Sequence, residues 1–271
     1  MILWCSTAYT NKFTSRRTNG NHWPIVALGS GQIRCWWSNA QRFRKWIFAI
    51  VFTMQMAVKL NIAAMARAPS LNLSTKKKLI KRKRIRVEIK KGIIELNLEE
   101  DGNVTVDMTI PVLDAELVPF NTADLKSKTE GFATLWPLEI GKKKILISAI
   151  SMGNPHAVQI VEDVDTVDVA AEGPAIEHHE RFPERVNAAF MQIVDPHHIK
   201  LRVFERGAGE TLACGTGACA AVVSGILRGR LNSPVKVIAR GGELNIQWAG
   251  VGTSVMLTGP AVKVFEGEIN L

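Results

Sequence analysis

Polar and apolar residues alternate along most of the chain from residue 85 onward. Residues 86–90, 95–98 and 104–108 each follow this two-residue period, and the turn sequence Asp101-Gly102-Asn103 separates the last two. Such a period is typical of a strand with one buried and one solvent-facing side, so the pattern predicts a β-meander. Similar strands are predicted at residues 144–150, 157–161, 190–194, 200–205, 235–239, 243–248, 254–257 and 261–266.

Two stretches are predicted to be helical instead. Residues 166–172 predict a short helix before Gly173-Pro174, and residues 218–227 predict a second one just after Cys214-Gly215-Thr216-Gly217. The apolar face of the second helix is almost continuous, which is typical of a buried central helix. Together the elements predict the α+β class, with strongly bent antiparallel strands wrapped around central helices.

Residues 1–78 differ from the remainder. They show no sustained helical or strand periodicity and are not expected to form a folding unit. Their best apolar run, residues 47–58, is shorter than the about 20 residues that span a bilayer. Arg16, Arg17 and Arg34 precede this run, whereas a secretory signal places its apolar core near the start. We therefore expect no membrane partner and a cytoplasmic location.

The charges divide the chain at the same region. The 271 residues carry a net charge of +9, yet every Asp and Glu lies at Glu88 or later. The first 87 residues hold 17 basic residues, and five of the seven Trp lie before residue 47. The remaining 184 residues combine 17 basic with 25 acidic residues, a net charge of −8. Two compositions are joined, so the overall charge gives no reason to expect nucleic acid as a partner. A binding protein with residues 1–87 as a basic nucleic-acid arm remains an alternative of a different class.

The densest group of chemically useful residues follows a predicted strand. Glu205-Arg206 ends that strand, a glycine-rich loop follows, and Cys214 precedes the buried helix. Free backbone N–H groups at a helix N-terminus bind anions, and Gly215 and Gly217 would let a carboxylate approach them closely. The same positive helix end favours a thiolate. Cys214 is therefore predicted to act as a base or nucleophile beside a bound carboxylate.

Two further segments contain candidate residues. Residues 151–156 follow a strand and include Asn154, whose amide can donate and accept, and His156, which can tune the protonation of a neighbouring thiol. Asn187 opens a strand after Phe182-Pro183-Glu184-Arg185.

The other cysteines and histidines indicate no metal site. Cys219 lies inside the helical pattern and is predicted to pack in the core. The chain has no C-x-x-C pair. Four histidines lack ligand spacing with Cys or Asp and are predicted to lie at the surface: His178, His179, His197 and His198.

These segments, in their order and spacing, resemble diaminopimelate epimerase over about residues 79–271. The motif Glu-Arg-Gly-Ala-Gly-Glu-Thr-x-Ala-Cys-Gly-Thr-Gly-Ala at 205–218 is highly specific. Met-Gly-Asn-Pro-His at 152–156, Glu-Arg-Phe-Pro-Glu-Arg at 180–185 and Leu-Thr-Gly-Pro-Ala at 257–261 strengthen it. The resemblance implies two similar domains of bent antiparallel strands, each around a central helix, with the active site in the cleft. Residues 79–113 and 260–271 would be what remains of the N-terminal domain, and residues 114–259 the C-terminal domain.

The resemblance also implies an activity, the interconversion of LL- and meso-diaminopimelate without cofactor or metal, in lysine and peptidoglycan precursor synthesis by a homodimer. One cysteine thiolate removes the α-proton and a second cysteine thiol, on the other face, reprotonates the carbon. Cys214 matches one of them, and His156 and Glu205 match residues that tune the thiols. The residues that match substrate contacts are Asn154, Asn187, Glu205, Arg206, Gly215 and Thr216. A related racemase of the proline type remains an alternative.

The other half of the site departs from the family pattern. The first cysteine motif, C-G-N-G-A-R, is missing, and neither Cys5 nor Cys35 has a suitable context. Reading residues 62–68 from the third base of each codon permits C-G-N-G-A-R. The same offset permits Y-N-A-D-G from residues 52–57 and G-I-G-T-D with L-V-V from residues 29–39. We therefore interpret residues 1–78 as an out-of-frame translation that ends at the lysine run 76–78, and expect the chain as written to be inactive.

Overall fold

The computed structural model describes residues 84–89 and 92–261 and, before them, four separate strands. The chain divides into two compact units. One comprises Met1–Val104 with Pro260–Leu271, and the other comprises Thr105–Gly259. The predicted strand beyond residue 261, the segment 62–68 and the lysine run 76–78 lie outside the described residues. The domain boundaries drawn from the resemblance stay a prediction.

The four early strands form an antiparallel sheet in the order β1-β2-β3-β4. They are β1 (Thr14–Arg16), β2 (Ile25–Leu28), β3 (Gly31–Ser38) and β4 (Ile47–Thr53). The sequence pattern did not predict these strands, and the expectation that residues 1–78 form no folding unit stays a prediction. The strands are rich in Ile, Val, Phe and Trp, residue types with high β-propensity even where polar and apolar positions do not alternate.

A β-hairpin follows in the same unit. Its strands β5 (Arg84–Ile89) and β6 (Gly92–Leu98) pair antiparallel, with Arg84 opposite Asn97 and Ile89 opposite Gly92. This confirms the strands predicted from the alternating pattern at residues 86–90 and 95–98.

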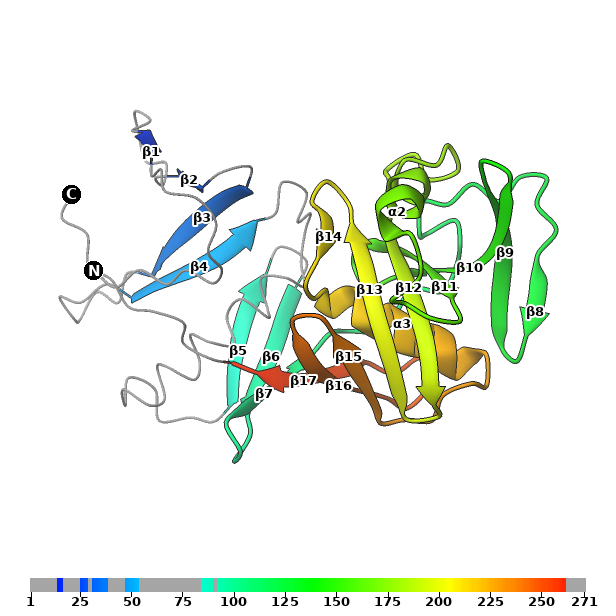
Figure 1. Cartoon of the computed structure of the whole chain (residues 1–271). Coiled ribbons are helices and arrows are strands. Elements are labelled where there is room, and N and C mark those ends of the chain that lie inside the picture. Colours follow the sequence, from blue (N-terminus) through cyan, green and yellow to red (C-terminus); the bar gives the residue numbers. More distant parts are fainter. Residues whose placement is uncertain are drawn as a thin grey trace. The chain divides into compact units, whose positions relative to one another are not determined.

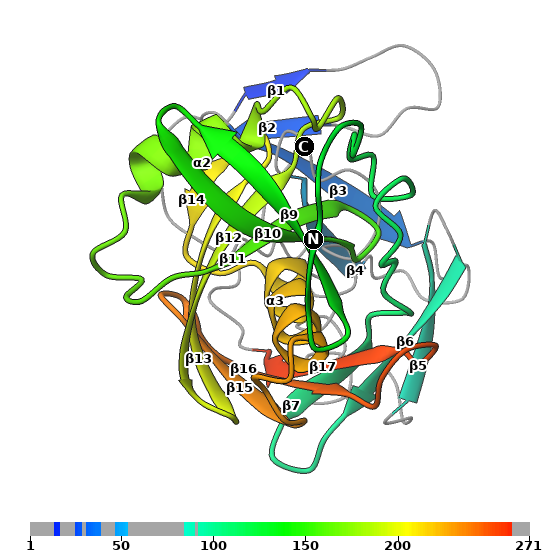
Figure 2. The ribbon, with the colours of Figure 1, turned by 90° about the vertical axis from the view of Figure 1, so that its right-hand side faces the viewer.

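The second unit has a long, mixed sheet around one helix. Its strands follow the order β7-β17-β16-β15-β13-β12-β11-β10-β9-β8, and β14 pairs with β13 at its side. The α3 helix contacts β10, β11, β12, β13 and β16, and Figure 2 shows the strands arranged around it. The bounds are β7 (Asn103–Asp107), β8 (Lys128–Glu130), β9 (Ala133–Ile140), β10 (Lys143–Ser151), β11 (Pro155–Ile160), α2 (Val169–Glu177), β12 (Asn187–Asp195), β13 (His198–Glu205), β14 (Gly209–Thr211), α3 (Gly215–Leu227), β15 (Val235–Ala239), β16 (Gly242–Trp248) and β17 (Val255–Pro260).

The α+β class and the central helix are confirmed, with corrections of detail. Two neighbouring pairs, β11 with β12 and β13 with β15, run parallel, whereas the alternating pattern predicted antiparallel strands throughout. Sequence alternation reports which side of a strand is buried and carries no information about the direction of its partner. The strands β8, β9 and β14 were not predicted.

The central helix α3 begins three residues earlier than predicted. Gly215, Thr216 and Gly217, predicted to be loop, form its first turn, because the backbone N–H of Ala218 donates to the Cys214 carbonyl oxygen at 2.9 Å. Eleven of its residues are buried, which confirms the prediction of a central buried helix. Cys214 is its N-cap residue, and the helix follows β14 along the chain (Figure 1).

The helix α2 runs past the point where it was predicted to end. It continues through Gly173 and Pro174 to Glu177. The side chain of Asp168 caps its start by accepting from the Ala171 N–H at 3.0 Å. A Cβ atom on Gly173 would lie 2.5 Å from the Phe204 ring. Glycine therefore marks close packing of the helix on β13 rather than its end.

None of the helices in the described part of the chain is long and apolar enough to cross a membrane.

Candidate active site

The thiol of Cys214 lies at the N-terminus of α3, with only 5% of the residue exposed. Its Sγ accepts from the Gly217 N–H at 3.4 Å and lies 3.5 Å from the Thr216 Oγ1. Both groups belong to the first turn of the helix, where backbone N–H groups lack intrahelical acceptors. The structure thus brings Cys214 to the helix end that its sequence context predicted.

The carboxyl group of Glu205 faces this thiol from the end of β13. Glu205 is buried, and it shares a hydrogen bond with Cys214 and accepts another from the Thr211 hydroxyl. Burial raises the pKa of Glu205, and the two hydrogen bonds oppose that rise. A buried carboxyl group with a raised pKa beside a thiol can exchange a proton with it.

The protonation of Cys214 differs from the prediction. Burial, followed by the negative charge of Glu205, raises the thiol pKa well above its usual range. The Thr216 hydroxyl and the Gly217 N–H lower that pKa, but less strongly. The helix end therefore does not by itself produce a thiolate here, and the thiol keeps its proton unless a base removes it.

A chain of hydrogen bonds connects the second predicted segment to the same thiol. The His156 Nε2 lies 3.1 Å from the Asn154 Oδ1, and the Asn154 Nδ2 donates to the Thr216 Oγ1 at 3.3 Å. The Thr216 hydroxyl in turn contacts the Cys214 Sγ. Residues about 60 positions apart in sequence thus meet at one atom.

The imidazole of His156 is neutral in this setting. It is fully buried on β11, and burial, followed by the positive charge of Arg206, lowers its pKa to about 3. Because Asn154 presents its carbonyl oxygen, the Nε2 atom is the donor in that bond and Nδ1 carries no proton. The Nδ1 atom is buried and has no hydrogen-bond partner among the described residues.

The side chain of Asn187 joins two neighbouring parts of the site. Its Nδ2 donates to the Pro155 carbonyl oxygen at 2.9 Å, and its Oδ1 accepts from the Arg206 backbone N–H at 2.9 Å. The prediction treated Asn187 as a substrate contact. In the structure its Oδ1 and one amide hydrogen bind backbone, so it links the start of β11 to the residue that follows β13.

Arg206 is held in place by backbone as well as by charge. It is buried, and its Nη1 donates to the Glu184 carbonyl oxygen at 2.7 Å. Burial lowers its pKa, while the charges of Glu184 and Glu177 raise it. Glu177 was not predicted: it is buried on α2, and its Oε1 accepts from the Gly207 N–H at 2.7 Å. The helix was expected to end before this residue, so no sequence signal assigned it.

The first turn of α3 can hold an anion. Within the described part of the chain, no atom accepts a hydrogen bond from the backbone N–H of Gly215 or Thr216. Two free N–H groups at a helix N-terminus, together with the helix dipole, favour a carboxylate at that point. Gly215 and Thr216, predicted as a carboxylate cradle, have the geometry to serve as one.

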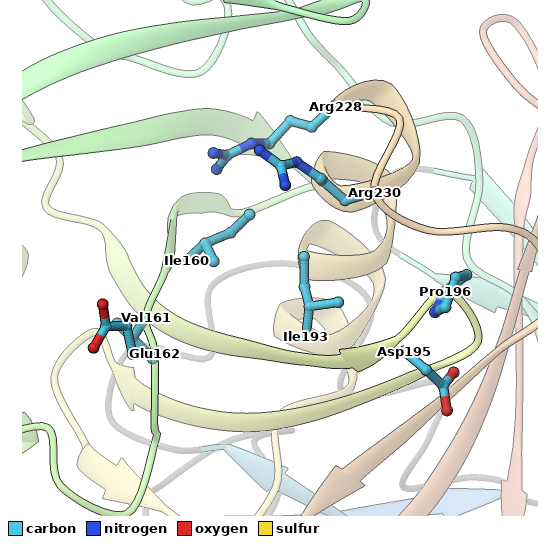
Figure 3. Close-up of a pocket in the computed structure, with 8 residues that line it drawn as sticks. All are labelled: Ile160, Val161, Glu162, Ile193, Asp195, Pro196, Arg228 and Arg230. Carbon is cyan, nitrogen blue, oxygen red and sulfur yellow. The ribbon is translucent and has the colours of Figure 1, made fainter.

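A surface pocket of about 470 Å³ lies at the other end of α3 (Figure 3). The helix has 13 residues and is thus about 20 Å long, which separates the pocket from Cys214. Arg228 and Arg230 on its wall both bind Glu130, each at 2.8 Å. The remaining lining residues are Ile160, Val161, Glu162, Ile193, Asp195 and Pro196.

The fold is shared with known racemases and epimerases. A hydroxyproline epimerase from Agrobacterium vitis is 13% identical, with a TM-score of 0.55, covering 88% of this chain and 74% of that one. A probable proline racemase from Agrobacterium radiobacter is 12% identical, with a TM-score of 0.56, covering 88% and 76%. Both of these neighbours are isomerases by name, and at 12–13% identity the likeness shows the shared fold alone.

Sequence relatives give the family. Residues 148–264 match the family model described as diaminopimelate epimerase. The diaminopimelate epimerase of Herminiimonas arsenicoxydans is 64% identical over 197 residues, which cover 73% of this chain and 70% of that protein. That of Paraburkholderia xenovorans is 58% identical over 189 residues, covering 69% and 66%. The chain belongs to the diaminopimelate epimerase family.

Proposed function

We propose that Cys214 is one of the two acid–base residues of a diaminopimelate epimerase, and that the chain as written carries this half of the site without the other. The observation that carries this proposal is the position of the thiol. It lies at the N-terminus of α3, bonded to a helix N–H and facing the buried carboxyl group of Glu205. His156 and Asn154 reach the same thiol through Thr216.

The proposed proton transfer starts at the thiol. Glu205 takes the proton from Cys214, and the resulting thiolate removes the α-proton of the bound amino acid, so that the sulfur regains a proton and the carbon keeps the electron pair. The carboxylate of the substrate binds the N–H groups of Gly215 and Thr216, which also stabilise the charge that develops at the α-carbon. The buried setting strengthens both interactions because water does not screen them.

The second half of the reaction needs an acid on the opposite face of the α-carbon. A thiol at Cys214 can return a proton only to the face from which it came, which regenerates the starting stereoisomer. Inversion therefore requires the second cysteine, and the family supplies it in the C-G-N-G-A-R motif that this chain lacks. The proposal of an out-of-frame segment accords with the quarter of the chain that the Herminiimonas relative leaves unmatched.

We further propose that the frame-restored protein works in the cytoplasm as a homodimer, with diaminopimelate as its substrate. The side chains of Asn154, Glu205 and Arg206 would contact the substrate, and Asn187 would do so with the one amide hydrogen that does not bind backbone. Buried thiols that act in proton transfer accord with a reducing compartment.

The experiment compares two proteins: the chain as written and a version whose coding sequence is returned to the frame that encodes C-G-N-G-A-R. Each is incubated with LL-diaminopimelate, and the meso form is quantified by chiral chromatography, with L-proline as a second substrate. We expect the restored protein to form the meso isomer, and neither the written chain nor a restored Cys214→Ala variant to do so. Epimerisation by the written chain would refute the proposal, as would proline racemisation by the restored one.

A further inference from the structure

Cys214 and Glu205 act on each other's pKa through a hydrogen bond, in which they compete for one shared proton, and each of them contacts a threonine hydroxyl. The Thr211 hydroxyl donates to the Glu205 carboxylate. The Thr216 hydroxyl contacts the Cys214 Sγ at 3.5 Å. Thr211 lies on β14, which pairs with β13, whereas Thr216 lies in the first turn of α3. The two hydroxyl groups thus contact the two residues that compete for the shared proton, each from a different element.

The Thr216 hydroxyl also contacts Asn154. Its oxygen accepts from the Asn154 Nδ2 at 3.3 Å, and Asn154 accepts from His156 through its Oδ1. A Cys214 thiolate has no hydrogen to give, so in its contact with the thiolate the Thr216 hydroxyl is the donor. Every donor along this chain points toward the sulfur, and the Gly217 N–H adds another at 3.4 Å. This arm stabilises negative charge on sulfur.

The Thr211 hydroxyl has the opposite effect on the pair. It donates to the carboxylate form of Glu205, and such a charge-assisted bond is strongest while Glu205 is ionised. An ionised Glu205 leaves the shared proton on sulfur. Removing this donor would make the carboxylate a better base toward Cys214.

We propose that Thr211 and Thr216 are positioning residues with opposite effects on which group carries the shared proton. Thr211 favours the proton on Cys214, and Thr216 favours it on Glu205. The relevance of this balance to catalysis rests on the proposed function, in which that proton must leave the thiol before the substrate can react. The sequence predicted no role for Thr211, and it predicted Thr216 only as part of a carboxylate cradle. The balance keeps the thiol protonated at rest and yet within reach of a base.

The groups that face the thiol leave few other sources for such an effect. Glu205 is the charged group that acts on Cys214 directly. His156 is neutral and acts only through Asn154 and Thr216. The charge of Arg206 acts on His156 rather than on the sulfur.

The test measures the thiol itself and needs no turnover. The full-length chain and its Thr211→Val and Thr216→Val variants are alkylated with iodoacetamide across about pH 6–10, where thiols titrate. Fragment-ion mass spectrometry separates Cys214 from Cys219 within the peptide that carries both. Valine has the shape of threonine without the hydroxyl. Near neutral pH we expect alkylation of Cys214 to become about tenfold faster in Thr211→Val and about tenfold slower in Thr216→Val, the size expected for one hydrogen bond to a charged group.

Three controls separate this effect from a loosened site. The Thr211→Ser and Thr216→Ser variants keep the hydroxyl and should restore the parental rates. Cys219 is fully buried in α3, so its alkylation reports unfolding and must stay slow in every variant that is interpreted. In a Glu205→Gln background, Thr211→Val should lose its effect while Thr216→Val keeps its own.

The direction of the change in the Cys214 alkylation rate in each valine variant decides the outcome. Opposite changes in the two valine variants support the proposal. Changes in the same direction, no change, or an unaltered effect of Thr211→Val in the Glu205→Gln background overturn it. If Cys219 is alkylated rapidly in a valine variant, that variant is not interpreted. The alkylation rate of Cys214 in the matching serine variant is then compared with the parental rate, and a serine variant without the parental rate also overturns the proposal. Because alkylation requires neither substrate nor a second cysteine, a failed epimerisation assay would leave this result standing, and the converse holds as well.

Discussion

Replacing Asn187 with Ala should destabilise the second unit more than any exposed asparagine can. The variant removes two buried hydrogen bonds, one to the Pro155 carbonyl oxygen and one from the Arg206 N–H, both at 2.9 Å. A buried backbone group that loses its partner costs about 1–3 kcal/mol. Two such groups give an expected loss of about 2–4 kcal/mol in the free energy of unfolding, at the lower end of that sum because the small cavity can admit water.

Cys219 supplies a local assay for this loss. It is fully buried in the middle of α3, and burial raises its pKa, so alkylation requires that the unit opens. When opening and closing are fast, the alkylation rate follows the equilibrium population of the open form. A loss of 2 kcal/mol then appears as about a 30-fold faster reaction.

The matched control is Asn245→Ala, on an exposed position of β16 in the same unit. Its effect should stay within about 0.5 kcal/mol, as for most surface substitutions. If Asn187→Ala and Asn245→Ala change the Cys219 rate equally, Asn187 does not join β11 to the end of β13 in the way described, and it would be free to bind substrate with its whole amide.

Two other predictions concern pH and packing. Because burial lowers the pKa of His156 to about 3, below its ordinary value of 6.5, the folded unit resists a proton that the unfolded chain accepts. Stability is therefore fully present above about pH 6.5 and falls toward pH 3 by about 1.4 kcal/mol per pH unit; urea unfolding at several pH values should show this slope in the parent and a smaller one in His156→Gln, and equal slopes would contradict it. At Gly225, a Cβ would lie 2.3 Å from Leu231 Cδ1, so Gly225→Ala should destabilise by about 1–3 kcal/mol through overpacking. In a Leu231→Ala background the same change should be nearly neutral, and an undiminished penalty in the double variant would show that the Leu231 side chain is not its cause.

Much of the candidate site could be predicted from local patterns. The strand that ends at Glu205, the glycine-rich turn and the apolar helix after Cys214 each have short-range signatures. A helix N-terminus beside a cysteine and a carboxylate indicates acid–base chemistry before any coordinates are known. The strand beginning at Asn187 and the buried nature of α3 were likewise predicted, because burial on one side of an element repeats with the period of that element.

Other features depended on packing. The start of α3 at Gly215 and the passage of α2 through Gly173 and Pro174 run against local glycine and proline signals, since contacts with the sheet outweigh those weak preferences. The parallel pairing of β11 with β12 follows from the crossover between them, and the alternation of polar and apolar residues carries no information about such a crossover.

The sequence alone determined the α+β class, the central helix, the thiol at its start and the family, because these depend on short motifs and on periodicity. Only the tertiary structure decided how the thiol is poised. The pKa of Cys214 is raised because folding buries it against Glu205, and Thr216 is bound to Asn154 because α3 lies against the end of β10 and the start of β11. Desolvation and hydrogen bonding act through space, so residues far apart in sequence set the charge of a group whose own neighbours favour the opposite state.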